Sequence, residues 1–428
     1  MNRPILIAGG RVIDPSRAAD GRADVLLLDG KVEAVGAGIG APDGARVIDA
    51  AGKVVAPGLI DLHVHLREPG QEDLETVATG AMAAAAGGFT AVCAMPNTDP
   101  VTDNQAAVGF IIRQAMRAGK ARVYPIGAIS IGQNGEQLTE FGEMVGAGAV
   151  AVSDDGRPVV SSHLMRTALE YAQVFGIPVA DHCEDPTLSA GGAMHEGLVS
   201  TRLGLKGIPA AAEEIMVARD ILLAELTGGH VHLCHMSTRG SVDLIRRAKD
   251  KGLRVTAEAT PHHFALTHER VEGYDTNAKM NPPLREAADR EAIRQALRDG
   301  TIDVIATDHA PHHYDAKERE FDLAPNGILG LETAFGLAVK ELVEPGLLTL
   351  PQLIDRMSTT PARVFRLPGG TLATGASADV VVLDPGAGWI ADPARFFSKS
   401  RNTPFGDVSL TGRADLTIVG GRVVYERV

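Results

Sequence analysis

The sequence predicts an α/β protein made of a (β/α)8 TIM-like barrel and a small discontinuous β-sandwich domain built from both chain ends. Three observations lead to this fold class. The chain has 428 residues, enough for two or three domains. Its two ends carry similar glycine-containing motifs, whereas the middle alternates short apolar runs with alanine-rich helical stretches. Strands that alternate with helices favour parallel pairing, and eight such units in about 300 residues match the size of a closed barrel.

The two ends of the chain resemble each other in two places. The sequence IAGGRV at 7–12 returns as IVGGRV at 418–423, and ADVLLLDG from Ala23 returns as ADVVVLDP from Ala378. Glycine-rich turns can look alike by chance, but here two separate motifs recur. We therefore expect residues 1–56 and 366–428 to form one composite β-sandwich domain, with the barrel, residues 57–365, inserted between them.

Within 57–365 the eight expected strands end in recognisable segments. In chain order these are GLIDLHVHL, TAVCAMPN, ARVYPIGAIS, AGAVAVSDD, IPVADHC, HVHLCHMS, LRVTAEATPHH and DVIATDH. An open doubly wound sheet would look similar locally, but it would favour a phosphate-binding glycine motif after its first strand. No such motif follows the first expected barrel strand, so the closed barrel is preferred.

Composition and charge exclude several classes of protein. The formal net charge is −13, from 41 basic and 54 acidic residues, which argues against a protein that binds nucleic acid through its phosphates. No window has the run of about 18 apolar residues typical of a membrane-spanning helix, and the N-terminus has no signal-peptide pattern. The three cysteines, Cys93, Cys183 and Cys234, give no disulfide framework and fit a reducing compartment. We therefore expect a cytoplasmic protein that binds neither nucleic acid nor membrane.

Polar residues collect where the expected strands end, and active sites of barrels lie there. His63 and His65 are two positions apart, so both point to one side of an extended strand, and Arg67 continues that side. Two such histidines alone are often only a polar pair. Four more strand ends add metal-binding side chains, which are Asp154 or Asp155, His182, His235 and Asp308. Imidazole nitrogen and carboxylate oxygen suit zinc, so the set predicts one or two zinc ions.

The remaining histidines and cysteines receive structural interpretations. By strand alternation His232 and His309 should face away from the metals, and Cys183 and Cys234 should point outward as buried thiols. His262 and His263 are assigned to packing. His163, His195 and His268 lie in stretches that read as helix or loop and are expected to be solvated.

The combination of DLHVHLREPG, MPNT, SDDG, DHCED, HMST, NPPLR and ATDHAPHH resembles the amidohydrolase superfamily and, within it, the class I dihydroorotases. The resemblance extends over essentially the whole chain. It implies a zinc-dependent enzyme that reversibly converts N-carbamoyl-L-aspartate to L-dihydroorotate in de novo pyrimidine biosynthesis.

The resemblance also assigns metal ligands. His63, His65 and Asp308 hold one zinc, and His182 and His235 hold the second. Many superfamily members bridge the metals with a carboxylated lysine, but no lysine occurs between Lys120 and Lys206. Some class I enzymes use the second aspartate of a DDG motif instead, so Asp155 is the expected bridge and Asp154 the alternative.

The same resemblance assigns the reacting and substrate-binding groups. Asp308 would act as base and then as acid, and Arg67 would pair with the substrate carboxylate through its forked guanidinium. The other expected substrate contacts are His65, Asn97, Asn281, His312 and the backbone of Asn326 and Gly327. Asn97 and Asn281 stand beside prolines, where asparagine also caps turns.

Two other functions remain open from the sequence. One is a dihydropyrimidinase- or allantoinase-type cyclic-amide hydrolase, although those relatives generally use the bridging lysine. The other is an inactive homologue that serves as a structural partner of aspartate transcarbamoylase, although such homologues lose metal ligands. A homo-oligomer is expected, and association with aspartate transcarbamoylase is a further expectation without a readable motif.

Overall fold

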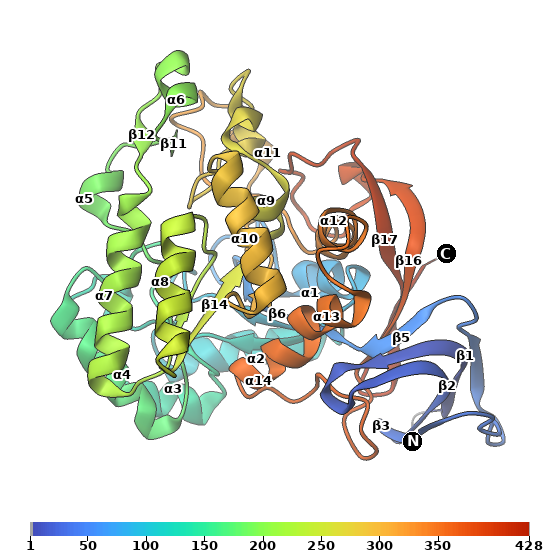
Figure 1. The fold of residues 1–428 in the computed structure, drawn as a ribbon. Helices are drawn as coiled ribbons and strands as arrows, with labels where there is room; N and C mark the ends of the chain where they lie inside the picture. Colours follow the sequence, from blue (N-terminus) through green and yellow to red (C-terminus); the bar gives the residue numbers. More distant parts are fainter. Residues whose placement is uncertain (1–2, 428) are drawn as a thin grey trace.

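A computed structural model describes residues 3–427 of the chain. Its centre is a closed barrel of eight parallel strands surrounded by helices, and a separate sheet lies to one side (Figure 1). The barrel strands coincide with all eight expected segments, which confirms the predicted fold class. They are β6 (Leu59–Val64), β7 (Phe89–Ala94), β8 (Arg122–Pro125), β9 (Val152–Ser153), β10 (Val179–Asp181), β13 (Val231–Leu233), β14 (Val255–Ala259) and β15 (Val304–Ile305).

The barrel closes through two short bridges between its hydrogen-bonded sheets. One sheet has the order β6-β7-β8 and the other β15-β14-β13-β10-β9. Gly127 beyond β8 pairs with Val152 in β9, and Val64 at the end of β6 pairs with His309 beyond β15, both in parallel register. Because all strands run the same way, their carboxyl ends meet at one mouth of the barrel.

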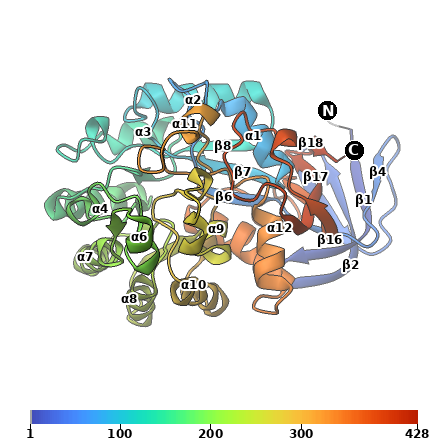
Figure 2. The same ribbon diagram turned by 90° about the horizontal axis from the view of Figure 1, so that it is seen from above.

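Helices cover the outside of the barrel, as the view from above shows (Figure 2). The longer ones are α1 (Val77–Ala86), α2 (Gln105–Ala118), α3 (Phe141–Ala147), α4 (Ser162–Phe175), α7 (Ala211–Thr227), α8 (Arg239–Asp250) and α10 (Ala287–Asp299). Some of their starts carry local capping signals: the Thr238 side chain accepts from Ser241 N at the start of α8, and the Asn104 side chain accepts from Ala106 N at the start of α2. The connections at the carboxyl mouth differ in length, from the short one between Leu233 and Arg239 to longer ones such as that between Pro125 and Phe141.

Shorter helices complete the upper and lower faces. They are α5 (Pro186–Ser189), α6 (Leu198–Leu203), α9 (Pro261–Ala265), α11 (Tyr314–Lys317), α12 (Ala334–Ala338), α13 (Leu350–Ile354) and α14 (Thr360–Val364). A two-stranded excursion, β11 (Met194–His195) with β12 (Gly207–Ile208), stands between β10 and α7 above the barrel (Figure 1). In the described part of the chain no helix is long and apolar enough to cross a membrane.

The separate sheet contains strands from both ends of the chain. Its order is β18-β17-β16-β5-β1-β2-β3, and β4 pairs with β1. The N-terminal strands are β1 (Ile5–Asp14), β2 (Ala19–Leu28), β3 (Lys31–Gly36), β4 (Arg46–Asp49) and β5 (Val54–Pro57). The C-terminal strands are β16 (Val380–Ile390), β17 (Ser409–Val419) and β18 (Arg422–Glu426). Antiparallel pairing of β5 with β16 joins the two ends directly.

Two apolar layers hold the barrel. One fills its interior and includes Ile60, Leu62 and Ile126 together with Phe365, which follows α14. The other lies between the strands and the surrounding helices and includes Phe89, Phe141 and Phe264. Burial of these side chains supplies the main stabilisation, at about 1.5 to 3 kcal/mol for each fully buried large side chain. The rigid barrel therefore fixes where each strand end points.

Candidate active site

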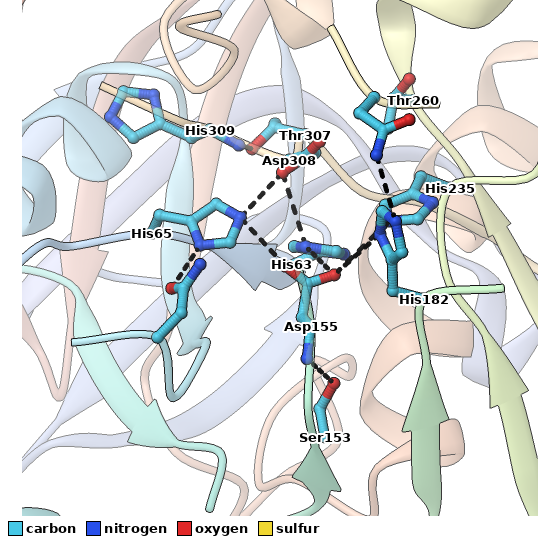
Figure 3. Close-up of polar contacts among 12 residues, drawn as sticks. His63, His65, Ser153, Asp155, His182, His235, Thr260, Thr307, Asp308 and His309 are labelled. Carbon is cyan, nitrogen blue, oxygen red and sulfur yellow. Dashed lines mark hydrogen bonds and ion pairs between the residues drawn. The ribbon is translucent and has the colours of Figure 1, made fainter. Parts of the chain in front are cut away.

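Four histidines and two aspartates meet at the carboxyl mouth of the barrel, and all six side chains are buried (Figure 3). They come from five strand ends that are far apart in the sequence. His63 and His65 stand at the end of β6, Asp155 after β9, His182 after β10, His235 after β13 and Asp308 after β15. The structure thus brings together the six residues predicted to bind metal.

Asp155 lies at the centre of this cluster. Its Oδ1 is 3.5 Å from His63 Nε2, 3.6 Å from His182 Nδ1 and 3.4 Å from His235 Nε2. Its Oδ2 is 3.5 Å from His65 Nε2. The two oxygens of one carboxylate therefore face different histidines, which is the arrangement of a group that can bridge two ions.

Asp308 lies on the side of the cluster formed by β6. Its Oδ1 is 3.0 Å from His65 Nε2 and 3.5 Å from His63 Nε2. Asp308, His235 and Arg67 all have positive φ angles, of 49°, 39° and 61°. Residues other than glycine rarely adopt this left-handed conformation, and such strain concentrates at functional sites. At each position the chain turns sharply as it leaves a strand, which directs the side chain over the mouth.

Several ligand atoms at the centre have no partner. His63 Nε2 and Asp155 Oδ1 are buried without a hydrogen bond within residues 3–427. His182 Nδ1 and His235 Nε2 lie 2.9 Å apart, so one of them must carry a proton unless a cation lies beside them. Unpartnered buried polar atoms are costly, and this donor set is one that zinc and similar divalent ions prefer. The cluster therefore fits a divalent metal ion.

The electrostatics of the cluster lead to the same conclusion. Burial lowers the pKa of His182, but Asp155 and Glu184 raise it to about 10. Burial raises the pKa of Asp155, but the charge of His63 and the nearby imidazoles of His182 and His235 hold it well below its usual range. Burial likewise opposes ionisation of Asp308, and the nearby histidines keep its pKa low. The two carboxylates thus demand positive charge, which protons or a metal ion can supply.

Asp154, the alternative bridge, points away from the histidines. Its Oδ1 accepts from Ile129 N at 2.8 Å and from Ser130 N at 3.1 Å, and its Oδ2 accepts from the Ser130 hydroxyl. Neighbouring side chains on an extended chain point to opposite sides, so only one of the two aspartates can reach the cluster. In this structure that residue is Asp155.

Glu258 on β14 supports His63 and was missed by sequence reasoning. Its Oε1 is 2.6 Å from His63 Nδ1. Burial opposes its ionisation, but His63 and a hydrogen bond from His232 lower its pKa to about 2, so it is a carboxylate that accepts a hydrogen bond from each histidine. His63 therefore carries its proton on Nδ1, and its Nε2 is free to bind metal. In the sequence TAEAT, Glu258 looks like an ordinary strand residue, and its partner His63 is 195 positions away.

The hydrogen bonds continue from Glu258 through the barrel. Glu258 Oε2 is 3.0 Å from His232 Nε2, and His232 Nδ1 is 2.9 Å from Thr256 Oγ1. Thr256 Oγ1 is also 2.8 Å from His230 Nε2. This hydrogen-bonded series of five residues is called the His63–His230 line, and its members are His63, Glu258, His232, Thr256 and His230. His232 does face away from the metal cluster, but it supports a ligand of that cluster at one remove.

Three structural expectations for other residues were wrong. Cys234 lies in the barrel interior with Cys93 and does not point outward, because the chain turns sharply at His235 and alternation stops there. His195 and His268 are 7% and 4% exposed and are therefore not solvated. Their ring centroids are 5.3 Å apart with the planes tilted by 56°, and His195 belongs to β11, whose pairing with β12 the helix-like sequence pattern did not reveal.

The expected substrate-binding residues lie on the same mouth. Arg67 is buried, its Nε donates to Pro311 O at 3.2 Å, and its Nη2 is 3.5 Å from His312 Nε2. Burial lowers the pKa of Arg67 to about 10, so it remains a cation at neutral pH. Burial and the charge of Arg67 lower the pKa of His312 to about 3, so its imidazole is neutral. His312 Nε2 lies 2.7 Å from Asn326 O.

The other expected contacts have partners in the protein. Asn97 Oδ1 is 2.8 Å from His65 Nδ1, and Asn281 Nδ2 donates to Glu184 Oε2 at 2.9 Å. Gly327 N donates to Lys279 O, and Gly327 O accepts from Asn402 Nδ2. Gly327 has a φ of +119°, and a β-carbon there would approach the β-carbon of Ala310 to 2.6 Å, so this position requires glycine.

The whole chain is similar to known proteins. A dihydro-orotase-like family model matches residues 52–241, and an amidohydrolase family model matches residues 224–425. A dihydroorotase of Anaeromyxobacter dehalogenans is 58% identical over 428 residues, covering 100% of this chain and 99% of that protein. A dihydroorotase of Pelotomaculum thermopropionicum is also 58% identical, over 99% of this chain and 98% of that protein.

Solved structures of related enzymes match as well. An L-hydantoinase (dihydropyrimidinase) from Arthrobacter aurescens has a TM-score of 0.88 and 28% identity, covering 100% of this chain and 96% of that one. A D-hydantoinase (dihydropyrimidinase) from Thermus sp. has a TM-score of 0.84 and 26% identity, covering 99% and 95%. The fold is thus shared with cyclic-amide hydrolases, whereas the sequence is much more similar to the dihydroorotases.

Proposed function

The chain belongs to the dihydroorotase family of amidohydrolases, and we propose on this basis that it interconverts N-carbamoyl-L-aspartate and L-dihydroorotate in pyrimidine biosynthesis. The observation that carries the proposal is the cluster of six ligands at the barrel mouth, whose unpartnered atoms face one another beside a buried arginine. Its position at the carboxyl ends of the strands is where barrel enzymes place their chemistry.

We propose zinc as the metal, one or two ions per subunit. His63, His65 and Asp308 would hold one ion, His182 and His235 the other, and Asp155 would bridge them. Zinc bound there would supply Lewis acidity, which polarises a carbonyl group and lowers the pKa of water. The absence of a lysine from this stretch of the chain fits the carboxylate of Asp155 at the bridging position.

The protein's own groups would then bind and orient the substrate. The Arg67 guanidinium matches the α-carboxylate of either substrate, because its fork makes two parallel hydrogen bonds to a carboxylate. Asn97, Asn281 and His312 line the same mouth and would fix the ring or the ureido group, with His65 and the backbone of Asn326 and Gly327 beside them. Neutral His312 keeps Arg67 free of a competing charge.

Asp308 would move the proton. Its low pKa keeps it a carboxylate, and it stands at the edge of the cluster with Oδ1 on His65. In hydrolysis it would take a proton from the attacking water and deliver it to the ring nitrogen as the C–N bond breaks. In the biosynthetic direction the proton would travel the opposite way.

A dihydroorotate hydrolysis assay on purified protein, with metal analysis of the same sample, tests the proposal. We expect zinc in the protein and turnover in both directions, loss of activity on chelation, and recovery when zinc is restored. Hydantoin and dihydrouracil are the control substrates, because they lack the carboxylate that Arg67 would bind. Preferred turnover of these controls would instead indicate a dihydropyrimidinase. A zinc-loaded protein with no turnover would favour the inactive homologue.

We further propose that the protein works in the cytoplasm as a homo-oligomer, with aspartate transcarbamoylase as a candidate partner. All three cysteines are buried and unpaired, which fits a reducing compartment. Sedimentation of the purified protein, alone and with aspartate transcarbamoylase of the same organism, measures both associations.

A further inference from the structure

The amino-terminal mouth of the barrel, opposite the metal cluster, carries a recess of about 300 Å³. Three arginines line it. Arg254 stands just before β14, Arg363 lies near the end of α14, and Arg366 follows that helix. His230, which precedes β13, lines the recess as well.

The three guanidinium groups have no carboxylate partner within residues 3–427. Arg254 donates to Gly228 O at 3.4 Å and Arg363 to Thr360 Oγ1 at 3.2 Å, both neutral acceptors. Asp303 also lines the recess, but its Oδ2 already accepts from Lys249 Nζ at 2.6 Å. Three exposed arginines thus line one recess without an ion pair within residues 3–427, in a chain whose net charge is −13.

The positive field of these arginines reaches the imidazole of His230. Burial, His232, Arg254 and Arg366 together lower the pKa of His230 to about 3, so the ring is neutral. Like charges held close together repel, and an anion placed between them removes that repulsion. The recess therefore has an electrostatic reason to bind a negative ligand.

The negative carboxyl ends of nearby helices balance only part of this positive charge. Arg254 faces Gly228, the C-cap of α7, and a β-carbon on Gly176, the C-cap of α4, would lie 2.6 Å from Arg366 Nη1. The carboxyl end of a helix carries roughly half a negative charge. Two helix ends therefore balance about one of the three cations, and the remainder is left for a ligand.

We propose that this recess binds a phosphoryl group, supplied either by free phosphate or by a nucleoside monophosphate. A phosphoryl dianion matches the remaining charge, and its oxygens match the forked donors of arginine. The volume is at the lower end of the range for small-molecule sites, which is large enough for a nucleoside monophosphate.

The recess is joined to the metal cluster by the His63–His230 line, whose contacts are all between 2.6 and 3.0 Å. An anion beside His230 polarises the near end of this line, and Glu258 at the other end orients a metal ligand. Occupancy of the recess is thus expected to change kcat/KM. This consequence rests on the proposed dihydroorotase activity, whereas binding itself does not.

Isothermal titration of the zinc-loaded protein tests binding directly. The probes are inorganic phosphate, AMP and UMP, with adenosine and uridine as controls that lack the phosphoryl group. We expect saturable binding of phosphate or of the nucleotides and none of the nucleosides. Similar affinities for phosphate and nucleotides would identify free phosphate as the ligand, and at least tenfold tighter nucleotide binding would identify the nucleotide. No saturation below about 10 mM with any probe would overturn the proposal.

A double variant locates the binding. Arg254→Gln with Arg366→Gln should weaken binding about tenfold or more, because two charge-assisted contacts are lost. The matched control is Arg166→Gln with Arg246→Gln, which removes two exposed arginines that are ion-paired elsewhere and should leave affinity within about twofold. Phosphate bound at the zinc site would remain in both double variants. Equal affinity in the parent and the Arg254/Arg366 variant would therefore reject the recess as the site.

Thr256→Val separates binding from its effect on activity. Valine keeps the shape of threonine but cannot bond to His230 or His232. We expect this variant to retain anion affinity within about twofold while the change in kcat/KM on anion addition disappears. An anion effect on kcat/KM that survives in Thr256→Val, or that is absent from the parent, would refute the coupling while the binding data stand.

Discussion

The metal-ligand cluster has two halves, one with His63 and His65 at the end of β6 and the other with His182 and His235. Both are built from the same kinds of side chain, but these side chains are supported differently. In the half at β6, His63 is held by Glu258 at 2.6 Å and His65 by Asn97 at 2.8 Å, so both rings present Nε2 to the centre. In the other half, His182 Nε2 has Glu184 Oε2 at 3.0 Å, but His182 Nδ1 and His235 Nε2 face each other at 2.9 Å, and His235 Nδ1 has no described partner.

This difference separates preorganised ligands from ligands that an ion must organise. A buried carboxylate or amide that fixes the tautomer of a histidine makes the ring ready to bind metal. Two histidines whose ligand atoms face each other are in conflict until a cation arrives. We therefore expect the β6 half to keep its geometry without metal and the other half to depend on it. Four experiments test this contrast, from the largest expected effect to the smallest.

Asp155→Ala should have the largest effect, because this carboxylate serves both halves. We expect loss of at least one zinc per subunit and a fall in activity of about three orders of magnitude or more. The matched control is Asp154→Ala, which should keep zinc. It should lower the free energy of unfolding by about 1 to 3 kcal/mol, because Ile129 N and Ser130 N lose their acceptor. Metal analysis and denaturant unfolding measure the two outcomes, and the reverse order of zinc loss would transfer the bridge to Asp154.

Asp308→Asn tests whether the β6 half also carries the proton transfer. The amide keeps the shape and an oxygen ligand but cannot act as a base. We expect near-normal zinc content and dihydroorotate binding, with kcat lower by about two orders of magnitude or more. The comparison requires equal zinc occupancy in parent and variant. A loss of less than tenfold would mean that another group moves the proton.

Arg67→Lys asks whether substrate recognition belongs to the same half. Lysine keeps a positive charge but cannot form the forked contact with a carboxylate. Loss of a charge-assisted contact, about 1.5 to 3 kcal/mol, corresponds to a fall in kcat/KM of roughly one to two orders of magnitude. Zinc content should not change. An unaltered kcat/KM would remove Arg67 from the substrate site.

Glu258→Gln and Glu184→Gln compare the supports of the two halves directly. Glu258 is fully buried between His63 and His232, whereas the Glu184 side chain is 16% exposed beside His182. We expect Glu258→Gln to lower zinc affinity about tenfold or more and Glu184→Gln to lower it only a few-fold. Competition with a zinc chelator measures both. A larger effect at Glu184 would contradict the idea that the β6 half is the preorganised one.

The repeated motif at the chain ends shows how far a sequence pattern can be taken. Both copies contribute to the same sheet, as expected. In the first copy Gly9 makes a bulge inside β1, with a φ of 73°, whereas in the second copy Gly420 and Gly421 form the turn between β17 and β18. Glycine permits either backbone, and the neighbouring strands decide which one forms.

The sequence by itself determined the eight strands, the closed barrel and the residue types at the strand ends, because these depend on local apolar patterns and on the short reach of each strand. It also limited the bridge to two adjacent aspartates. Only the tertiary structure decided that Asp155 faces the histidines, since strand register is set by pairing with β8 and β10. The same holds for Glu258 behind His63, Cys234 inside the barrel and the arginines of the opposite mouth. Each of these contacts joins residues far apart in the chain, and only the closed barrel brings them within hydrogen-bond or Coulomb range.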